Sequence, residues 1–137
     1  MSVAHPTSPR WRDVHEGDEL PPFDLPLTAS VIVAGAIASR DFMPAHHDAE
    51  FARAQGAPHL FMNILTTNGY VARFVTDWAG PEARLRNIKI RLGGPAIPGQ
   101  PLRFSGRVAK VSEDGELVGR QLFRVFKFDP RTIGAPR

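Results

Sequence analysis

The clearest periodic pattern of apolar residues falls within residues 61–79. One face of an α-helix is marked by apolar side chains seven, four and three positions apart: Ile64, Val71, Val75 and Trp78. Three more residues widen this face, which predicts a helix covered on most sides: Leu65, Ala72 and Phe74. Gly80 and Pro81 end the pattern, because proline cannot continue a helix.

After residue 81 the period of the pattern changes to two. Apolar and polar residues alternate over residues 88–92 and again over 102–111, which predicts two strands with one wet face each. A third strand, rich in Phe and Val, is predicted over residues 119–128. Residues 93–101 hold several glycines and prolines and are expected to form a turn-rich connection. The acidic, glycine-containing segment 113–116 is typical of a hairpin turn.

The N-terminal half is more irregular. Residues 19–27 contain three prolines and are expected to form at best an edge strand or an extended segment. Thr28 offers an N-cap for residues 29–40, where alanines favour helix and a Val-Ile-Val run favours strand; we interpret the segment as a helix. A short helix is predicted after Asp48, which can cap it, with Gly56 close to its end.

Helices precede antiparallel strands along this chain, which indicates an α+β fold. We expect a flexible N-terminal arm over residues 1–16, one domain over 17–128 and a Pro/Gly-containing tail over 129–137. One long apolar helix followed by a meander suggests an antiparallel sheet wrapped around that helix. Three well-marked strands are too few to cover it on all sides, so a partner sheet, and hence an oligomer, is expected.

The composition excludes several classes of protein. The 137 residues suffice for one domain and include no cysteine, so a disulfide framework, a cysteine–zinc site and a cysteine nucleophile are excluded. The first 17 residues lack the apolar core of a signal peptide, and no apolar run has the length of a membrane span, so we expect a cytoplasmic protein. The net charge is +3, mostly from arginine, which suits either phosphate binding or a solvated basic face. No basic run or helix-turn-helix pattern favours nucleic acid.

The densest group of chemically active side chains lies in the loop at residues 40–48. Pro44 stiffens this loop. Asp41 and His46 lie five positions apart in the sequence, a separation that can direct a carboxylate and an imidazole into one cleft. Such a pair can hold a water molecule and move its proton. The alternative is structural, with Asp41 as a helix cap and His46 as a polar loop residue. A metal site formed with His47 and the remote His59 is disfavoured, because adjacent histidines seldom face one ion.

The start of the long helix offers a second chemical group. Asn63 is expected in the first turn, where free N–H groups and the helix dipole could polarise a carbonyl as charge develops on its oxygen. The alternative is that Asn63 only caps the helix.

These residues resemble a known family. The pattern Asp41-x-x-Pro44-x-His46 before a long helix is similar to the MaoC-like group of hot-dog-fold enoyl-CoA hydratases, whose motif is Asp-x-Asn-Pro-x-His. Met43 stands where that motif has asparagine, and Asn63 stands where many members have glycine. A longer stretch, from about residue 17 to 111, closely resembles the small MaoC-like subunit of the heteromeric enoyl-CoA hydratase of steroid side-chain degradation. The resemblance is carried by residues 38–42, 46–48, 61–66, 75–81 and 91–93.

The resemblance implies a hot-dog fold, here with a shortened C-terminal hairpin. It implies that Asp41 and His46 are the catalytic pair and that the backbone N–H near Asn63 takes the oxyanion role. The substrate would be an acyl-CoA thioester, with no cofactor and no metal. A larger MaoC-like partner subunit, or a second copy in a homodimer, would complete the cleft, and neither nucleic acid nor membrane is implied.

The activity expected from this resemblance is (R)-type hydration of a trans-2-enoyl-CoA, or the reverse dehydration, with a steroid side-chain acyl group as the favoured substrate. The alternatives are an acyl-CoA thioesterase and a non-catalytic acyl-CoA-binding subunit. Five basic residues are candidates for the CoA phosphates: Arg73, Arg84, Arg86, Lys89 and Arg91.

Overall fold

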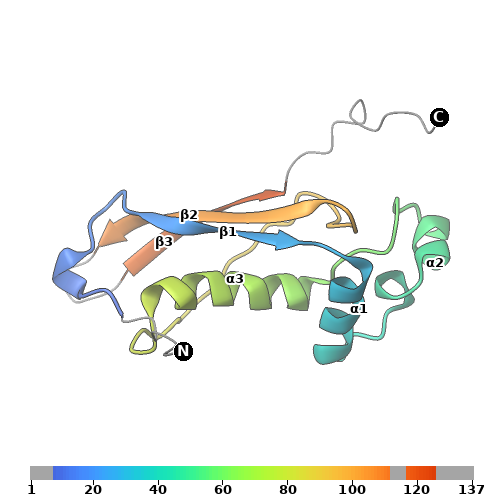
Figure 1. Cartoon of the computed structure of the whole chain (residues 1–137), viewed down its shortest axis with the longest axis horizontal. Helices are drawn as coiled ribbons and strands as arrows, with labels where there is room; N and C mark the ends of the chain where they lie inside the picture. The colour runs from blue at the N-terminus through green and yellow to red at the C-terminus, as the bar shows by residue number, and fades with distance from the viewer. Residues whose placement is uncertain (1–7, 112–116, 126–137) are drawn as a thin grey trace, which may run out of the picture.

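A three-stranded antiparallel sheet lies along one side of a long helix (Figure 1). The computed structural model describes residues 8–111 and 117–125. Along the chain the elements are a 3₁₀ turn (Trp11–Asp13), β1 (Glu19–Pro26), α1 (Ala29–Ala38), a second 3₁₀ turn (Pro44–His46), α2 (Ala49–Ala54), α3 (Ile64–Ala79), β2 (Pro101–Val111) and β3 (Leu117–Val125). The strand order is β1-β2-β3, and the smaller helices gather where α3 begins (Figure 1).

The prolines of β1 shape its pairing as predicted. β1 pairs with β2 alone within the described sheet, so it is an edge strand. The register shifts between Leu20 and Phe23, where Pro21 and Pro22 have no N–H to donate to the ladder. An ion pair between Asp24 and Arg103, at 2.8 Å, joins the strands beyond this bulge.

The predicted strand over residues 102–111 is confirmed as β2, and its alternating pattern places one face in the core. Phe104 is fully buried, with its ring centroid 6.1 Å from that of Phe74 and 6.2 Å from that of Tyr70 on α3. Phe23 on β1 joins this aromatic group at 5.5 Å from Phe104. Burial of these rings helps to hold α3 against the sheet.

The long helix begins later than predicted. It starts at Ile64, three residues after the predicted start, because Asn63 caps it and the Met62 N–H is bonded to Ala96 O at 2.9 Å. Val71 is buried as expected, but Ile64 and Leu65 are about half-exposed, so the expected covering on most sides is wrong for this single chain. Gly80 ends the helix with a positive φ of 78°, a conformation that costs glycine least.

The two shorter helices follow their predicted signals. The Thr28 side chain caps α1 by accepting the Val31 N–H at 3.2 Å, which confirms the helix, although it ends at Ala38 rather than Arg40. Asp48 caps α2 by accepting the N–H groups of Glu50 and Phe51.

The strand predicted over residues 88–92 is absent. Ile88 and Ile90 do face inward and are half-buried against the core, in keeping with the alternation. However, none of the three described strands pairs with this segment, so it forms no ladder hydrogen bonds. Alternation reports which side of an extended chain is buried, and a strand also needs a neighbour with which to pair.

The third predicted strand is confirmed as β3, which starts two residues earlier than expected, and the pairing of Val111 with Leu117 shows the predicted hairpin. Its turn at residues 113–116, the strand end at 126–128 and the tail at 129–137 lie outside the described residues. Residues 8–16, expected in a flexible arm, instead contact the domain: Val14 belongs to the core, and the Val111 N–H is bonded to the Glu16 carboxylate at 3.2 Å. Among the described helices, none has the length and apolar content for a membrane crossing.

Candidate active site

The position of Asp41 is fixed by the way in which α1 ends. The Asp41 N–H is bonded to Ala36 O at 2.9 Å and the Arg40 N–H to Ile37 O at 3.0 Å. This pair of bonds is the Schellman arrangement, and it requires a left-handed residue, which here is Arg40 with φ of 57°. Asp41 therefore leaves the helix in a defined direction.

His46 is fixed by the 3₁₀ turn that follows. Pro44 begins the turn, where its missing N–H costs nothing, and the His46 N–H is bonded to Met43 O at 3.0 Å. The Asp48 N–H is bonded to Pro44 O at 2.8 Å and leads into α2. Main-chain hydrogen bonds to the carbonyl groups of Met43 and Pro44 thus support the loop that the proline was predicted to stiffen.

The loop brings Asp41 and His46 together as predicted. The distance from Asp41 Oδ2 to His46 Nε2 is 3.5 Å, and their side chains are 25% and 9% exposed. His46 is thus a buried side chain that lies next to a carboxylate, not a solvent-exposed loop residue. Asp41 does receive the Met43 N–H at 3.3 Å, so its carboxylate also holds the loop.

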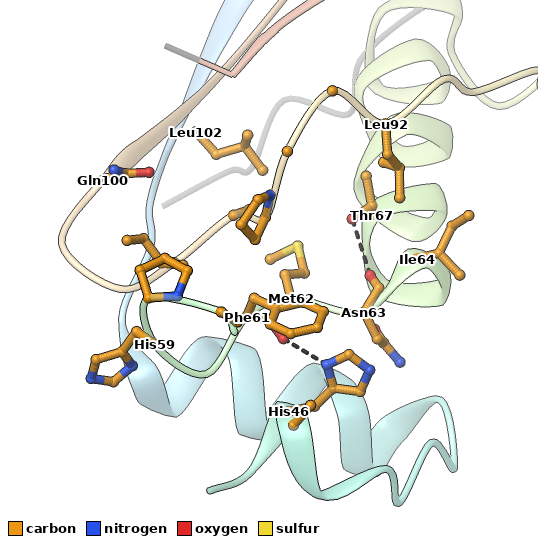
Figure 2. A pocket seen from close by; sticks show the side chains of 18 of the residues that line it. His46, His59, Phe61, Met62, Asn63, Ile64, Thr67, Leu92, Gln100 and Leu102 are labelled. Carbon is orange, nitrogen blue, oxygen red and sulfur yellow. Dashed lines mark hydrogen bonds between the residues drawn. The ribbon is translucent and has the colours of Figure 1, made fainter. Parts of the chain in front are cut away.

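The hydrogen bond made by the Nδ1 nitrogen of His46 determines which tautomer the ring adopts. Nδ1 lies 2.7 Å from the carbonyl oxygen of Phe61, and a carbonyl can only accept, so Nδ1 donates (Figure 2). The neutral ring then carries its lone pair on Nε2, the nitrogen that faces Asp41. Two acceptors at 3.5 Å cannot bond to each other, but they can share a water molecule that donates one hydrogen to each.

The Asp41 carboxylate is held in its ionised form. The side-chain amide of Asn63 donates to Asp41 Oδ2 at 2.9 Å, and this bond is the largest cause that lowers the Asp41 pKa below its ordinary value. Partial burial opposes it, whereas the Met43 N–H and the neighbouring His46 and His47 reinforce it.

Asn63 lies one position before the first turn of α3, and the predicted capping role is confirmed. Its Oδ1 accepts the Thr66 N–H at 2.9 Å, and its side chain is almost fully buried. The expected position inside the first turn is wrong, so the helical N–H groups nearest the dipole end belong to Ile64 and Leu65.

Three site contacts were not predicted from the sequence. The His47 Nε2 donates to the main-chain carbonyl of Asp41 at 3.0 Å, Ser39 Oγ accepts from Asn63 at 2.8 Å, and Phe61 contacts His46 ring edge to ring face at 4.9 Å. Only the His47 contact had a signal in the sequence, because His47 is adjacent to His46. The Ser39–Asn63 and His46–Phe61 contacts join residues that lie 24 and 15 positions apart.

A cavity of about 1700 Å³ opens beside the pair. Asp41, His46 and Asn63 line it together with a wall of mainly apolar residues from two segments, 55–64 and 90–104. Of the five basic candidates for CoA phosphates, Arg91 alone lines this cavity, whereas Arg73 is paired with Asp77 at 3.2 Å.

His59 also lines the cavity, on the side of Phe61 away from His46 (Figure 2). Its buried Nδ1 has no hydrogen-bond partner among the described residues. No group of three or more metal-ligating side chains converges within the part of the chain that the structure describes.

Comparison with known proteins gives the class to which this arrangement belongs. Residues 15–120 match the family described as MaoC like domain, and the chain belongs to this family of hot-dog-fold hydro-lyases.

Two of the matches are from Mycobacterium tuberculosis, one a protein sequence and one a solved structure. The 3-oxo-4,17-pregnadiene-20-carboxyl-CoA hydratase beta subunit is 45% identical over 97 residues, which are 71% of this chain and 75% of the relative. A chain of the crystal structure of the ChsH1-ChsH2 complex superposes with a TM-score of 0.72 at 44% identity, covering 78% of this chain and 87% of that chain. The (R)-hydratase from A. caviae involved in PHA biosynthesis shares the fold, with a TM-score of 0.65 at 17% identity over 82% of this chain and 87% of that chain.

Proposed function

We propose that this chain is the small catalytic subunit of a heteromeric enoyl-CoA hydratase, which adds water to a trans-2-enoyl-CoA to give the (R)-3-hydroxyacyl-CoA. The observation that carries the proposal is the geometry of Asp41 and His46, two acceptors 3.5 Å apart that face the cavity and can share one water molecule. The similarity to a steroid acyl-CoA hydratase subunit supports the substrate class.

The proton path follows from the contacts of the pair. Asp41, with its pKa lowered, is a weak base, so it orients the water while His46 Nε2 takes the proton. The hydroxide oxygen bonds to the beta carbon, the double-bond electrons move toward the thioester, and the Nε2 proton is delivered to the alpha carbon. The reaction is redox-neutral, so it needs neither an oxidant nor a reductant, and we propose no cofactor.

The start of α3 supplies the electrophilic half of the reaction. A thioester oxygen near the Asn63 main chain would meet N–H donors and the positive end of a 16-residue helix, which stabilise the negative charge that develops on it. This polarisation acidifies the alpha carbon and makes the beta carbon electrophilic.

A bulky acyl group suits the cavity. Its volume of about 1700 Å³ exceeds the roughly 300–1000 Å³ of common ligand pockets, and much of its wall is apolar. We therefore propose a steroid-derived acyl chain. The absence of cysteine supports a cytoplasmic enzyme.

A larger MaoC-like partner is part of the proposal. Four exposed apolar side chains are close in sequence to Asp41 or Asn63, two of them (Met43 and Ile64) line the cavity, and burial against a second subunit would remove all four from water: Phe42, Met43, Ile64 and Leu65. The similarity to a chain of a heteromeric complex supports the same assignment.

The test follows the loss of enoyl-thioester absorbance by the complex, on a short-chain and a steroid-bearing enoyl-CoA, while free thiol is measured in parallel. Asp41→Ala and His46→Ala should each slow hydration on the order of 100- to 10,000-fold. Thiol release in place of hydration would show a thioesterase. Hydration that survives both substitutions would show a non-catalytic subunit, and an inert complex would refute the hydratase assignment.

A further inference from the structure

Asn63 connects three parts of the site through one buried side chain. Its Nδ2 donates to Ser39 Oγ at 2.8 Å, at the end of α1, and to Asp41 Oδ2 at 2.9 Å. Its Oδ1 accepts the Thr66 N–H at 2.9 Å, in the first turn of α3. Both N–H groups and the amide oxygen are therefore used, as expected for a polar group that is only 2% exposed.

The orientation of this amide is set by its partners. The Ser39 hydroxyl donates to the Gly35 carbonyl at 2.8 Å, so towards Asn63 it is an acceptor. A flipped amide would place its oxygen against the Asp41 carboxylate and its NH₂ against the Thr66 backbone N–H, so that both of these contacts would be repulsive. The donor that faces Asp41 is thus specified by the fold.

We propose that Asn63 is a positioning residue, which fixes the direction of the Asp41 carboxylate toward His46 and couples it to the start of α3. The inference rests on the proposed function and extends it. Met43 binds the other carboxylate oxygen, but it belongs to the same loop as Asp41. Asn63 supplies the bond from a different element, so the carboxylate cannot rotate or move with its loop without breaking a buried contact.

Capping alone does not require this arrangement. A helix cap needs only an acceptor for the Thr66 N–H, and serine or aspartate provides that as well as asparagine does. The NH₂ group is superfluous for a cap and necessary for contact with Asp41. Asn63→Ser and Asn63→Asp therefore keep the cap and remove the NH₂ group that reaches Asp41, which separates the two roles.

The charged surroundings of Asp41 are simple. Among the described residues, the titratable groups that face its carboxylate are His46 and His47, both from its own loop. The neutral amide of Asn63 comes from the start of α3, and neutral Ser39 lies at the end of α1. A change in Asp41 titration in the neutral variant Asn63→Ser can thus be assigned to the lost amide donor.

The kinetic experiment uses the complex of the full chain with its partner subunit. Both Asn63 variants should lower kcat on the order of 100-fold, the cost of misplacing a reacting group by about 1 Å. In Asn63→Asp the added carboxylate also disfavours ionisation of Asp41. Asp48→Ala, which removes the cap of α2 away from the cavity, serves as the control and should leave kcat close to that of wild type.

A second readout does not depend on activity. Carbon-13 NMR titration of the Asp41 carboxyl, assigned with Asp41→Asn, should show its pKa rising from wild type to Asn63→Ser to Asn63→Asp. An unmoved pKa with unchanged kcat would show that Asn63 is only a cap and would overturn the inference. An inert wild-type complex would refute the hydratase assignment alone, since the titration still tests the contact. If Asn63→Ser fails to fold, Asn63→Thr carries the same test, because threonine also provides a cap acceptor and also lacks the NH₂ group.

Discussion

The Nδ1 nitrogen of His46 donates a hydrogen bond of 2.7 Å to the carbonyl oxygen of Phe61, and this bond places the basic lone pair on Nε2. The residue that we propose as the base for the substrate water is thereby held in one tautomer by the main chain that leads into α3. Two functions of His46 can be separated on this basis: support of the Phe61 carbonyl and proton transfer at Nε2.

His46→Asn should separate these functions. The asparagine NH₂ can take the place of Nδ1–H and keep the bond to Phe61, but nothing replaces Nε2. We expect hydration to fall on the order of 100- to 10,000-fold in both His46→Asn and His46→Ala. The alanine variant should in addition lose about 1–3 kcal/mol of unfolding free energy, because it leaves the carbonyl unpaired. Rate assays and urea denaturation give both quantities, and equal stability of the two variants would argue against the structural role of the bond.

Asp41 should make stability depend on pH in the acid range. Its pKa in the folded chain lies below the ordinary value, so its ionised form stabilises the fold. This contribution is complete above the unfolded pKa of about 4 and is lost as the pH falls through the lower folded pKa. The difference in unfolding free energy between wild type and Asp41→Asn should therefore shrink as the pH falls below the unfolded pKa of about 4. A difference that stays constant with pH would contradict the lowered pKa.

Sequence patterns predicted the helices and strands correctly where contacts between residues close in the sequence determine the structure. The caps at Thr28 and Asp48 and the alternation of β2 depend on neighbours within a few residues, and the structure confirms them. The Asp41–His46 pair was also predictable, because a proline-stiffened loop of six residues leaves few conformations. The assignment of a hydratase rests on more than spacing, since the family match covers residues 15–120.

Contacts between distant segments were not predictable in the same way. The Asn63–Asp41 bond spans 22 residues and forms only because α1 crosses α3 closely. Residues 88–92 show the alternation of a strand but have no neighbour to pair with in the described sheet. The periodicity of a segment does not indicate which distant residue or strand it will contact, because that contact is set by the packing of whole elements.

Arg40 stores backbone strain immediately before Asp41. Its φ of 57° is in the left-handed region, which costs a residue with a Cβ about 1–2 kcal/mol, and its side chain is exposed. Arg40→Gly should relieve this cost, less the roughly 0.5–1 kcal/mol that glycine loses in backbone entropy on folding. We expect a net gain of up to about 1 kcal/mol by denaturation, with the hydration rate within about twofold of wild type.

Arg40→Ala is the matched control, because it removes the same side chain but keeps the Cβ. It should gain no stability. If alanine and glycine stabilised the chain equally, the charge of Arg40 rather than its backbone would be responsible.

Gly35 allows the close crossing of α1 and α3. A Cβ at this position would lie 2.5 Å from both Cγ2 and Oγ1 of Thr66. Gly35→Ala should gain about 1 kcal/mol in helix propensity but lose roughly 1–3 kcal/mol through overpacking, so we expect net destabilisation. With Thr66→Ala in the background, the nearest side-chain atom left is the Cβ at 3.1 Å, and the loss should largely disappear.

A double-mutant cycle measured by denaturation tests this coupling. An interaction energy of about 1 kcal/mol or more between the two positions is expected for residues in contact. Additive effects would show that the helices can separate to accept the methyl group.

Arg91 is the basic residue that both lines the cavity and is exposed to solvent, so it is suited to meet a CoA phosphate at the mouth of the site. Arg91→Ala should raise KM for an enoyl-CoA about fivefold, equivalent to about 1 kcal/mol for an exposed charge pair, with kcat little changed. The same variant should leave KM unchanged for an enoyl-pantetheine, which carries the thioester without the phosphates.

Arg84→Ala provides the control, because Arg84 is exposed in the same basic segment but does not line the cavity. An equal effect of Arg91→Ala on both substrates would mean that Arg91 contacts the acyl or pantetheine part instead, and an equal effect of both arginines would reduce the result to general attraction by net charge.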